Sequence, residues 1–190
     1  MKVNRFSRNS AVAALVAIFT LCLPAIGAQA TENARLDQLF STLKQAEQIE
    51  AEKIAREIEL EFSKSGSATM DLLLKRGRDA LAIGRMREAI GHLTALTDHA
   101  PDFAEGFYYR ALAYFQAGMV GPSFADVEQV LALNPRHFGA IALLGVLMED
   151  MERPDMAQEA YRRVLDLYPG HKDAKEALTR LAPQLGDQEL

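Results

Sequence analysis

Four histidines and one cysteine are the side chains in this chain that most readily bind metal ions or act as nucleophiles. They are His92, His99, His137, His171 and Cys22. Their spacing matches none of the common zinc, serine-hydrolase or phosphate-loop motifs. His137 and His171 occupy equivalent places in a repeating pattern. Such places on neighbouring helical hairpins lie about 10 Å or more apart, whereas each ligand of a zinc ion lies about 2 Å from it. We interpret these histidines as loop residues and expect no catalytic residue, cofactor or metal ion.

The first thirty residues have the layout of a secretory signal peptide. Its basic residues are Lys2, Arg5 and Arg8. An apolar run over residues 11–23 follows, and small residues then lead to Ala30. As a helix this run would be about 20 Å long, which is short of the roughly 30 Å core of a membrane. We expect cleavage near Ala30 and a periplasmic or secreted protein with no membrane span in its mature chain; an uncleaved anchor is the alternative.

Composition favours one helical domain with short extensions. Of the 190 residues, 49% are hydrophobic and 25% are charged, which suffices for one core. The net charge is −5, and cleavage would remove three basic residues and no acidic ones, leaving −8. An acidic chain is a poor candidate for binding nucleic acid, because neutralised phosphates supply most of that affinity. Cys22 is the single cysteine and lies in the cleaved segment, so we expect no disulfide.

A period of 34 residues runs through the second half of the chain. Pro101, Pro135 and Pro169 are spaced by 34. The same offset aligns two sets of small residues, which are Gly77, Ala111 and Gly145, and Ala89, Ser123 and Ala157. It also aligns the apolar residues Leu93, Val127 and Tyr161. A fixed period of this length indicates stacked supersecondary units.

Each unit of this period is interpreted as two helices. The first helix ends near Gly84 or Gly118, and the second ends before the proline, which cannot continue a helix. The predicted helices cover residues 70–83, 86–98, 104–117, 121–133, 138–151 and 154–167. The small residues would let the paired helix axes approach closely, and Leu93, Val127 and Tyr161 would fill the next layer.

Residues 70–171 resemble three tetratricopeptide repeats, and residues 156–169 come closest to the family's second-helix pattern. Two departures are Glu152, which stands where the family has an inter-helix glycine, and Ser123, which stands where it has alanine. The resemblance implies an all-α superhelix with repeats at 70–103, 104–137 and 138–171. A signal peptide at 1–30 and a helical extension at 31–66 would precede them, and a capping helix with a tail at 172–190 would follow.

The extension carries apolar residues at helical spacings. These are Leu36, Phe40, Leu43, Ile54, Ile58 and Phe62. They predict two amphipathic helices within 31–63, broken near residues 48–51, with Ser65-Gly66-Ser67 as the joint to the first repeat. One interpretation is that this segment covers the N-terminal end of the stack. The other is that it self-associates or hooks a partner.

In the family, outward-facing residues of first helices line a groove that takes peptides or helices. By that correspondence the groove here carries Leu74, Lys75, Arg78, Tyr108, Tyr109, Leu112, Phe115, Glu149 and Asp150. Leu143 and Val146 lie on the same helix face, but we expect both to be buried. The Lys, Asn and Arg clamp with which chaperone-binding members hold a terminal carboxylate is absent at the corresponding positions.

Three functions are compatible with these patterns. The first is an exported adaptor that binds a partner protein or peptide in the groove, in a bacterial cell envelope. The second is a structural homo-oligomer assembled through the N-terminal helices. The third and least favoured is an enzyme, whose sign would be an acidic side chain of raised pKa inside a closed pocket.

Overall fold

The computed structural model describes residues 23–186, which contain nine helices and no strand. The helices are α2 (Leu23–Leu43), α3 (Gln48–Phe62), α4 (Ala68–Ala82), α5 (Met86–His99), α6 (Ala104–Gln116), α7 (Val120–Leu133), α8 (Phe138–Asp150), α9 (Pro154–Leu167) and α10 (Lys172–Gly186). No helix among these residues is both long enough and apolar enough to cross a membrane. The predicted signal peptide lies largely outside the described residues, although Ala30 falls within α2.

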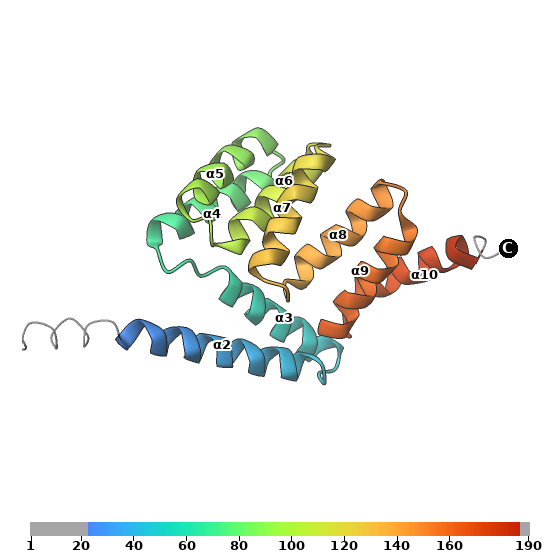
Figure 1. Ribbon diagram of the computed structural model, residues 1–190, viewed down its shortest axis with the longest axis horizontal. Coiled ribbons are helices and arrows are strands. Elements are labelled where there is room, and N and C mark those ends of the chain that lie inside the picture. The colour runs from blue at the N-terminus through green and yellow to red at the C-terminus, as the bar shows by residue number, and fades with distance from the viewer. Residues whose placement is uncertain (1–22, 187–190) are drawn as a thin grey trace, which may run out of the picture. The chain divides into compact units, whose positions relative to one another are not determined.

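The described residues divide between two compact units at Gln38 and Leu39, and the second unit contains α3 to α10. In the second unit, α4 packs on α5, α6 on α7 and α8 on α9, and each hairpin packs on the next. Figure 1 shows these hairpins following one another from α4 to α9, with α10 packed on the last. The predicted all-α hairpin architecture is therefore confirmed.

The six helices of the repeats begin and end within two residues of their predicted bounds. The break in the extension falls at residues 44–47, just before the predicted place, and Gly66 in the predicted joint has a φ of 74°. The positions of the prolines and glycines predicted these helix ends correctly, because each of these residues affects the backbone conformation of its own segment.

The small residues at equivalent positions permit close helix pairing, as predicted. A Cβ atom on Gly77 would lie 2.5 Å from Leu93 Cγ, and one on Gly145 would lie 2.6 Å from Tyr161 Cε1. Ser123 is fully buried, and its hydroxyl donates a hydrogen bond of 2.8 Å to the carbonyl of Ala111. A serine therefore replaces alanine there without leaving a buried polar atom unpaired.

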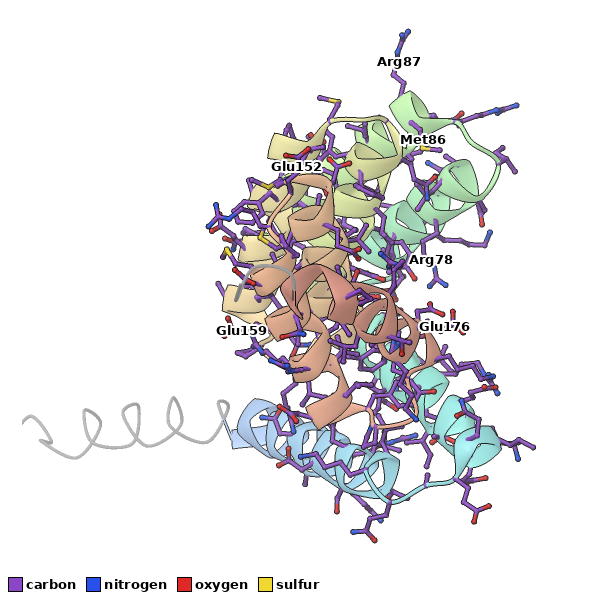
Figure 2. All side chains as sticks on the ribbon, turned by 90° about the vertical axis from the view of Figure 1, so that its right-hand side faces the viewer. Arg78, Met86, Arg87, Glu152, Glu159 and Glu176 are labelled. Atoms are coloured by element: carbon purple, nitrogen blue, oxygen red, sulfur yellow. The ribbon has the colours of Figure 1, made fainter. Side chains whose placement is uncertain are left out.

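All three hairpins turn with the same backbone geometry. Gly84 and Gly118 have φ values of 76° and 74°, and Glu152, labelled in Figure 2, has a φ of 57° at the equivalent place. In each turn the next amide donates across the helix end, as Arg153 N does to Met148 O at 2.8 Å. This is the hydrogen bond of a left-handed helix cap, which glycine adopts most easily. Glu152 therefore adopts a glycine conformation at a cost in free energy.

Helix α3 of the N-terminal extension contacts the repeats at several places. Its hydrogen bonds and ring contacts lie along the turns that precede α8 and α10, and Glu59 lies near enough to Arg78 on α4 and Glu105 on α6 for their charges to act on its pKa. Gln48 Nε2 donates to the carbonyl of Gly170 at 3.1 Å, and Lys172 Nζ donates to Glu52 at 2.7 Å. At its other end, Phe62 stacks on His137 with ring centroids 5.1 Å apart. The interpretation that the extension covers the N-terminal end of the stack therefore stays a prediction.

A largely buried ion pair within the second repeat is also linked to the first repeat. Arg110 on α6 donates to both carboxylate oxygens of Asp126 on α7, at 2.7 and 2.8 Å. It also donates to the Thr97 hydroxyl on α5 at 2.6 Å. The hydrogen bonds to Asp126 raise the pKa of Arg110 despite the opposing effect of burial. These contacts fix α6 between its neighbours.

Candidate functional site

Helices α6, α8 and α10 line an open hollow of about 410 Å³, which we call the inner groove. Its lining residues are Tyr108, Leu112, Phe115, Gln116, Gly139, Ala142, Leu143, Val146, Tyr161, His171, Asp173, Ala174, Ala177 and Arg180. The 34-residue period brings them together, because equivalent first-helix positions of successive repeats lie side by side. The middle of the lining is apolar, whereas charged residues come from α10.

Aromatic rings dominate the α6 end of the inner groove. Tyr108 contacts Tyr109 and His137 with ring centroids 5.2 and 4.4 Å away, and the Arg78 guanidinium lies 4.8 Å from the Tyr109 ring centre. Burial raises the pKa of both tyrosines, and the Glu105 carboxylate raises it further, to about 12 for Tyr109. Both hydroxyls are therefore neutral hydrogen-bonding groups near neutral pH.

His137 is buried between this aromatic cluster and α3. Its Nδ1 accepts a hydrogen bond from the Ala140 amide at 3.1 Å, which caps α8. Because Nδ1 is an acceptor, the ring proton lies on Nε2, which donates to Glu105 at 3.1 Å. His137 lies between helices, as predicted for a loop residue, but it is only 3% exposed. Its observed contacts organise the groove end, and sequence spacing gave no sign of its burial.

A three-residue polar cluster closes the other end of the inner groove. Arg180 on α10 donates to Glu149 on α8, which also accepts from the Tyr161 hydroxyl at 2.7 Å. Burial raises the pKa of Glu149, but the hydrogen bonds from Arg180 and Tyr161 outweigh it and hold the pKa below its ordinary value. The charge of Arg180 is therefore already balanced within the chain.

The structure brings together only part of the predicted groove. Tyr108, Leu112 and Phe115 line it, and Glu149 contacts two residues that do. Tyr109 and Arg78 pair with each other just beyond it. Lys75 forms an exposed ion pair with Asp79, and Asp150 is exposed outside the lining.

Two predicted exposures need correction. Leu74 is only 3% exposed, because it packs in the core of the first hairpin with Leu93 and Leu96, so it offers little surface to a ligand. Val146, which we expected to be buried, is 36% exposed and lines the inner groove. Leu143 is 5% exposed, as expected.

The contribution of α10 to the inner groove was missed. His171, Asp173, Ala174, Ala177 and Arg180 come from this helix or the residue before it. The sequence was interpreted only as a terminal helix with a polar outer face. Ala174, Ala177 and Leu181, which recur at helical spacing and are buried, could have shown which face packs inward and therefore which residues border the groove.

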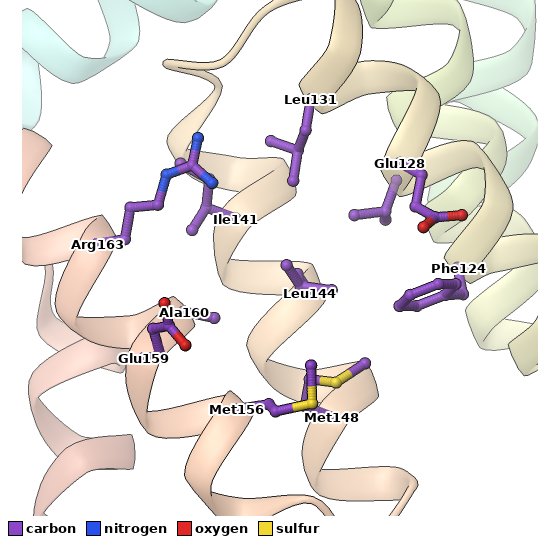
Figure 3. Close-up of a pocket in the computed structure, with 11 residues that line it drawn as sticks. Phe124, Glu128, Leu131, Ile141, Leu144, Met148, Met156, Glu159, Ala160 and Arg163 are labelled. Carbon is purple, nitrogen blue, oxygen red and sulfur yellow. The ribbon is translucent and has the colours of Figure 1, made fainter.

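A second hollow of about 250 Å³ lies between α7, α8 and α9 (Figure 3). Phe124, Leu131, Leu144, Met148 and Met156 form its apolar lining, and Glu128, Glu159 and Arg163 are among the other residues around it. Arg163 donates to the carbonyl of Pro135 at 2.8 Å. This hollow is smaller than the roughly 300–1,000 Å³ of typical ligand pockets. The inner groove is therefore the better candidate site.

A carboxyl group of raised pKa, which is one feature expected of an enzyme, occurs on α3 away from both hollows. Partial burial raises the pKa of Glu59 on α3, and the neighbouring Glu105 carboxylate adds to the effect. Glu59 lines neither hollow, and its side chain reaches the surface. Among the described residues, no three His, Cys, Asp or Glu side chains gather where they could hold a metal ion.

Stacked helical hairpins with a groove between their first helices define a helical-repeat protein. Tetratricopeptide repeat profiles match residues 74–120 and 142–171. A TPR repeat-containing protein of Rhizobium etli is 36% identical over 159 residues, which cover 83% of this chain and 78% of that protein. The chain belongs to the tetratricopeptide repeat proteins.

Solved structures of the same fold include peptide complexes. The first TPR of Spaghetti (RPAP3), bound to the HSP90 peptide SRMEEVD, has a TM-score of 0.61 and 26% identity, covering 63% of this chain and 95% of that one. The first TPR domain of human RPAP3 has a TM-score of 0.60 and 26% identity, covering 64% and 95%. The fold of this chain is therefore one that holds peptides in other proteins.

Proposed function

We propose that the protein is an exported adaptor that binds a partner protein or peptide in the inner groove. The observation that carries this proposal is the open apolar lining formed by Leu112, Phe115 and Val146, flanked by aromatic and charged residues. Large apolar and aromatic side chains at a groove centre supply most of the energy in protein interfaces. A related fold with a bound peptide supports the same use of this surface.

The charge distribution argues against a partner held by its terminal carboxylate. Arg180 is paired with Glu149, and Arg78 lies over the Tyr109 ring. A carboxylate would have to displace these contacts to be bound. The partner segment is therefore expected to insert apolar side chains, and an acidic peptide such as SRMEEVD is expected to bind weakly or not at all.

Site-specific crosslinking tests the groove with a matched control. Val146 lines the inner groove and Leu133 lies on α7 outside it, yet both are 36% exposed. A photo-reactive residue at 146 should give one discrete adduct in cells, and the same residue at 133 should not. Adding Phe115→Arg to the first variant should abolish the adduct while helicity and thermal cooperativity are retained. Equal adducts from both positions would exclude the groove as the binding site.

Export is a separate part of the proposal, supported by the basic residues, apolar run and small residues of the first thirty positions. When the protein is purified from a Gram-negative host, N-terminal sequencing should give Thr31 as the first residue. The mature chain would then lack the part of α2 up to Ala30. Ala28→Arg with Ala30→Arg should leave the longer precursor. A full-length chain recovered from the cytoplasm would overturn export but leave the groove proposal intact.

A further inference from the structure

One face of α4 is exposed although the equivalent faces of the later repeats are covered. In the second repeat, Gly106 and Ala113 are buried, and Arg110 reaches Thr97 on the preceding hairpin. In the third repeat, Ala140 and Leu147 are fully buried. The equivalents on α4 are Leu72, which is 47% exposed, and Arg76 and Asp79, which are also exposed. Within residues 39–186, the helices that pack most extensively on α4 are α5 and α6, and neither takes the place of a preceding hairpin.

The exposed face has a pattern that can pair with itself. Leu72, Arg76 and Asp79 of α4 and Ile83, the residue at its C-terminal cap, are spaced by four, three and four residues, which places them in one narrow stripe. We call this the α4 stripe. It reads apolar, positive, negative, apolar in one direction and apolar, negative, positive, apolar in the other. If two copies meet antiparallel, Leu72 of each faces Ile83 of the other, and Arg76 of each faces Asp79.

The charges of the α4 stripe are available for such pairing. Among the described residues, Arg76 forms no ion pair and Asp79 pairs only with Lys75, at 2.6 Å. The side chains of Lys75 and Asp79 are 70% and 62% exposed, so their ion pair contributes little to stability and Asp79 can exchange it for another partner. Ile83 is 65% exposed, which is high for a large apolar side chain.

We propose that the α4 stripe is the contact of a two-fold symmetric dimer, in which it pairs antiparallel with the same stripe of a second copy. Such an interface is isologous, so two apolar pairs and two ion pairs form at once. It differs from self-association through the N-terminal helices, because Phe40 and Leu43 are only 4% and 0% exposed within the chain.

The dimer leaves the inner groove open, since no residue of the α4 stripe lines it. A contact centred on one helix from each copy falls at the low end of interface sizes, below about 1,200 Å². We therefore expect a dissociation constant of about 1–100 μM, which corresponds to association energies common for weak transient complexes. One dimer would present two inner grooves, so that a partner with two binding segments would be held more tightly than either segment alone.

Charge reversal at the α4 stripe tests the proposal by sedimentation equilibrium of the purified protein between about 1 and 500 μM. Arg76→Asp and Asp79→Arg should each weaken the dimer by at least about 30-fold, because like charges then face each other across the axis. A 1:1 mixture of the two variants should form heterodimers, and a chain carrying both changes should dimerise like the unmodified protein. Arg162→Asp, which makes the same charge change at an exposed position of α9, should have no effect.

Restoration in the mixture and in the double variant distinguishes the antiparallel stripe from other contacts. A protein that stays monomeric throughout the concentration range would overturn the proposal. So would a dimer unaffected by either single change, since another surface or the N-terminal helices would then hold it. Leu72→Asp gives an independent check and should also abolish dimerisation, while circular dichroism confirms that each variant stays helical.

Discussion

His137 and His171 perform the same structural task in successive units. Each accepts a hydrogen bond at Nδ1 from the amide three residues later, from Ala140 at 3.1 Å and from Ala174 at 3.3 Å. This satisfies one of the free amides at the start of the following helix. Burial lowers the pKa of His171, and the nearby Asp173 offsets part of that shift. Both caps depend on a neutral imidazole.

Replacing His171 with asparagine should make stability less sensitive to acid. The pKa of His171 is lower in the folded chain than its ordinary value of 6.5, so the unfolded chain binds the proton first and stability falls as the pH drops below about 6.5. Asparagine can keep the cap without titrating. Urea midpoints of both proteins should therefore converge as the pH falls from 7 to 5. A constant difference between them would show that His171 does not contribute.

Ala89→Leu should destabilise the fold by about 1–3 kcal/mol through overpacking. Ala89 is fully buried where α4 and α5 meet, beside Leu93. The control is Ala125→Leu on α7, which makes the same change at an exposed position and should stay within about 0.5 kcal/mol. Urea denaturation measures both. Equal effects at the two sites would mean that the close approach of helices does not limit side-chain size at residue 89.

At the level of the elements, the turn of the third hairpin holds a non-glycine residue in a strained backbone conformation, which a substitution by glycine would relieve. Glu152 has a φ of 57°, where Gly84 and Gly118 serve the equivalent turns. Glu152→Gly should stabilise the protein by about 0.5–1 kcal/mol, since left-handed backbone costs a non-glycine residue about 1–2 kcal/mol and glycine's greater freedom in the unfolded chain offsets part of the gain. Gly84→Ala is the reverse change and should destabilise. Thermal unfolding of both variants tests the expectation, and a destabilised Glu152→Gly variant would contradict it.

Local signals explain why the repeat helices could be predicted and the site only partly. Pro101 and Pro135 cannot continue a helix, and the turn glycines readily adopt the positive φ of a helix cap, so their positions in the sequence carry the information. The groove depends instead on which helices meet. Arg180 borders the groove only because α10 packs on α9. Leu74 does not line it, because this residue lies on the face of α4 that packs into the core. Such facts arise from tertiary packing, which a repeat period does not encode.

At the scale of the second unit, α3 links parts of the chain that are far apart in sequence. Its first turn binds Gly170 and Lys172 at the start of α10, and its last residue, Phe62, stacks on His137 and lies 6.3 Å from the ring of Phe40. The hairpins of a repeat stack otherwise contact only their neighbours, so bending between them is weakly opposed. Because α3 spans the turns before α8 and α10, we expect it to hold these helices, and thus the inner groove, at a fixed separation.

Phe62→Ala should release α3 without unfolding the repeats. The change removes a half-buried ring from His137 and Phe40, and we expect a loss of about 1–3 kcal/mol, less than the roughly 3–5 kcal/mol of a fully buried phenylalanine. Amides of α3 should then exchange with deuterium faster, while those of α6 and α7 keep their protection. Leu60→Ala on the same helix is the control, because Leu60 is 63% exposed and its removal should leave exchange unchanged. If α3 and α7 lose protection together in Phe62→Ala, α3 is part of one cooperative core. If α3 alone responds, it is a separable brace on the repeats.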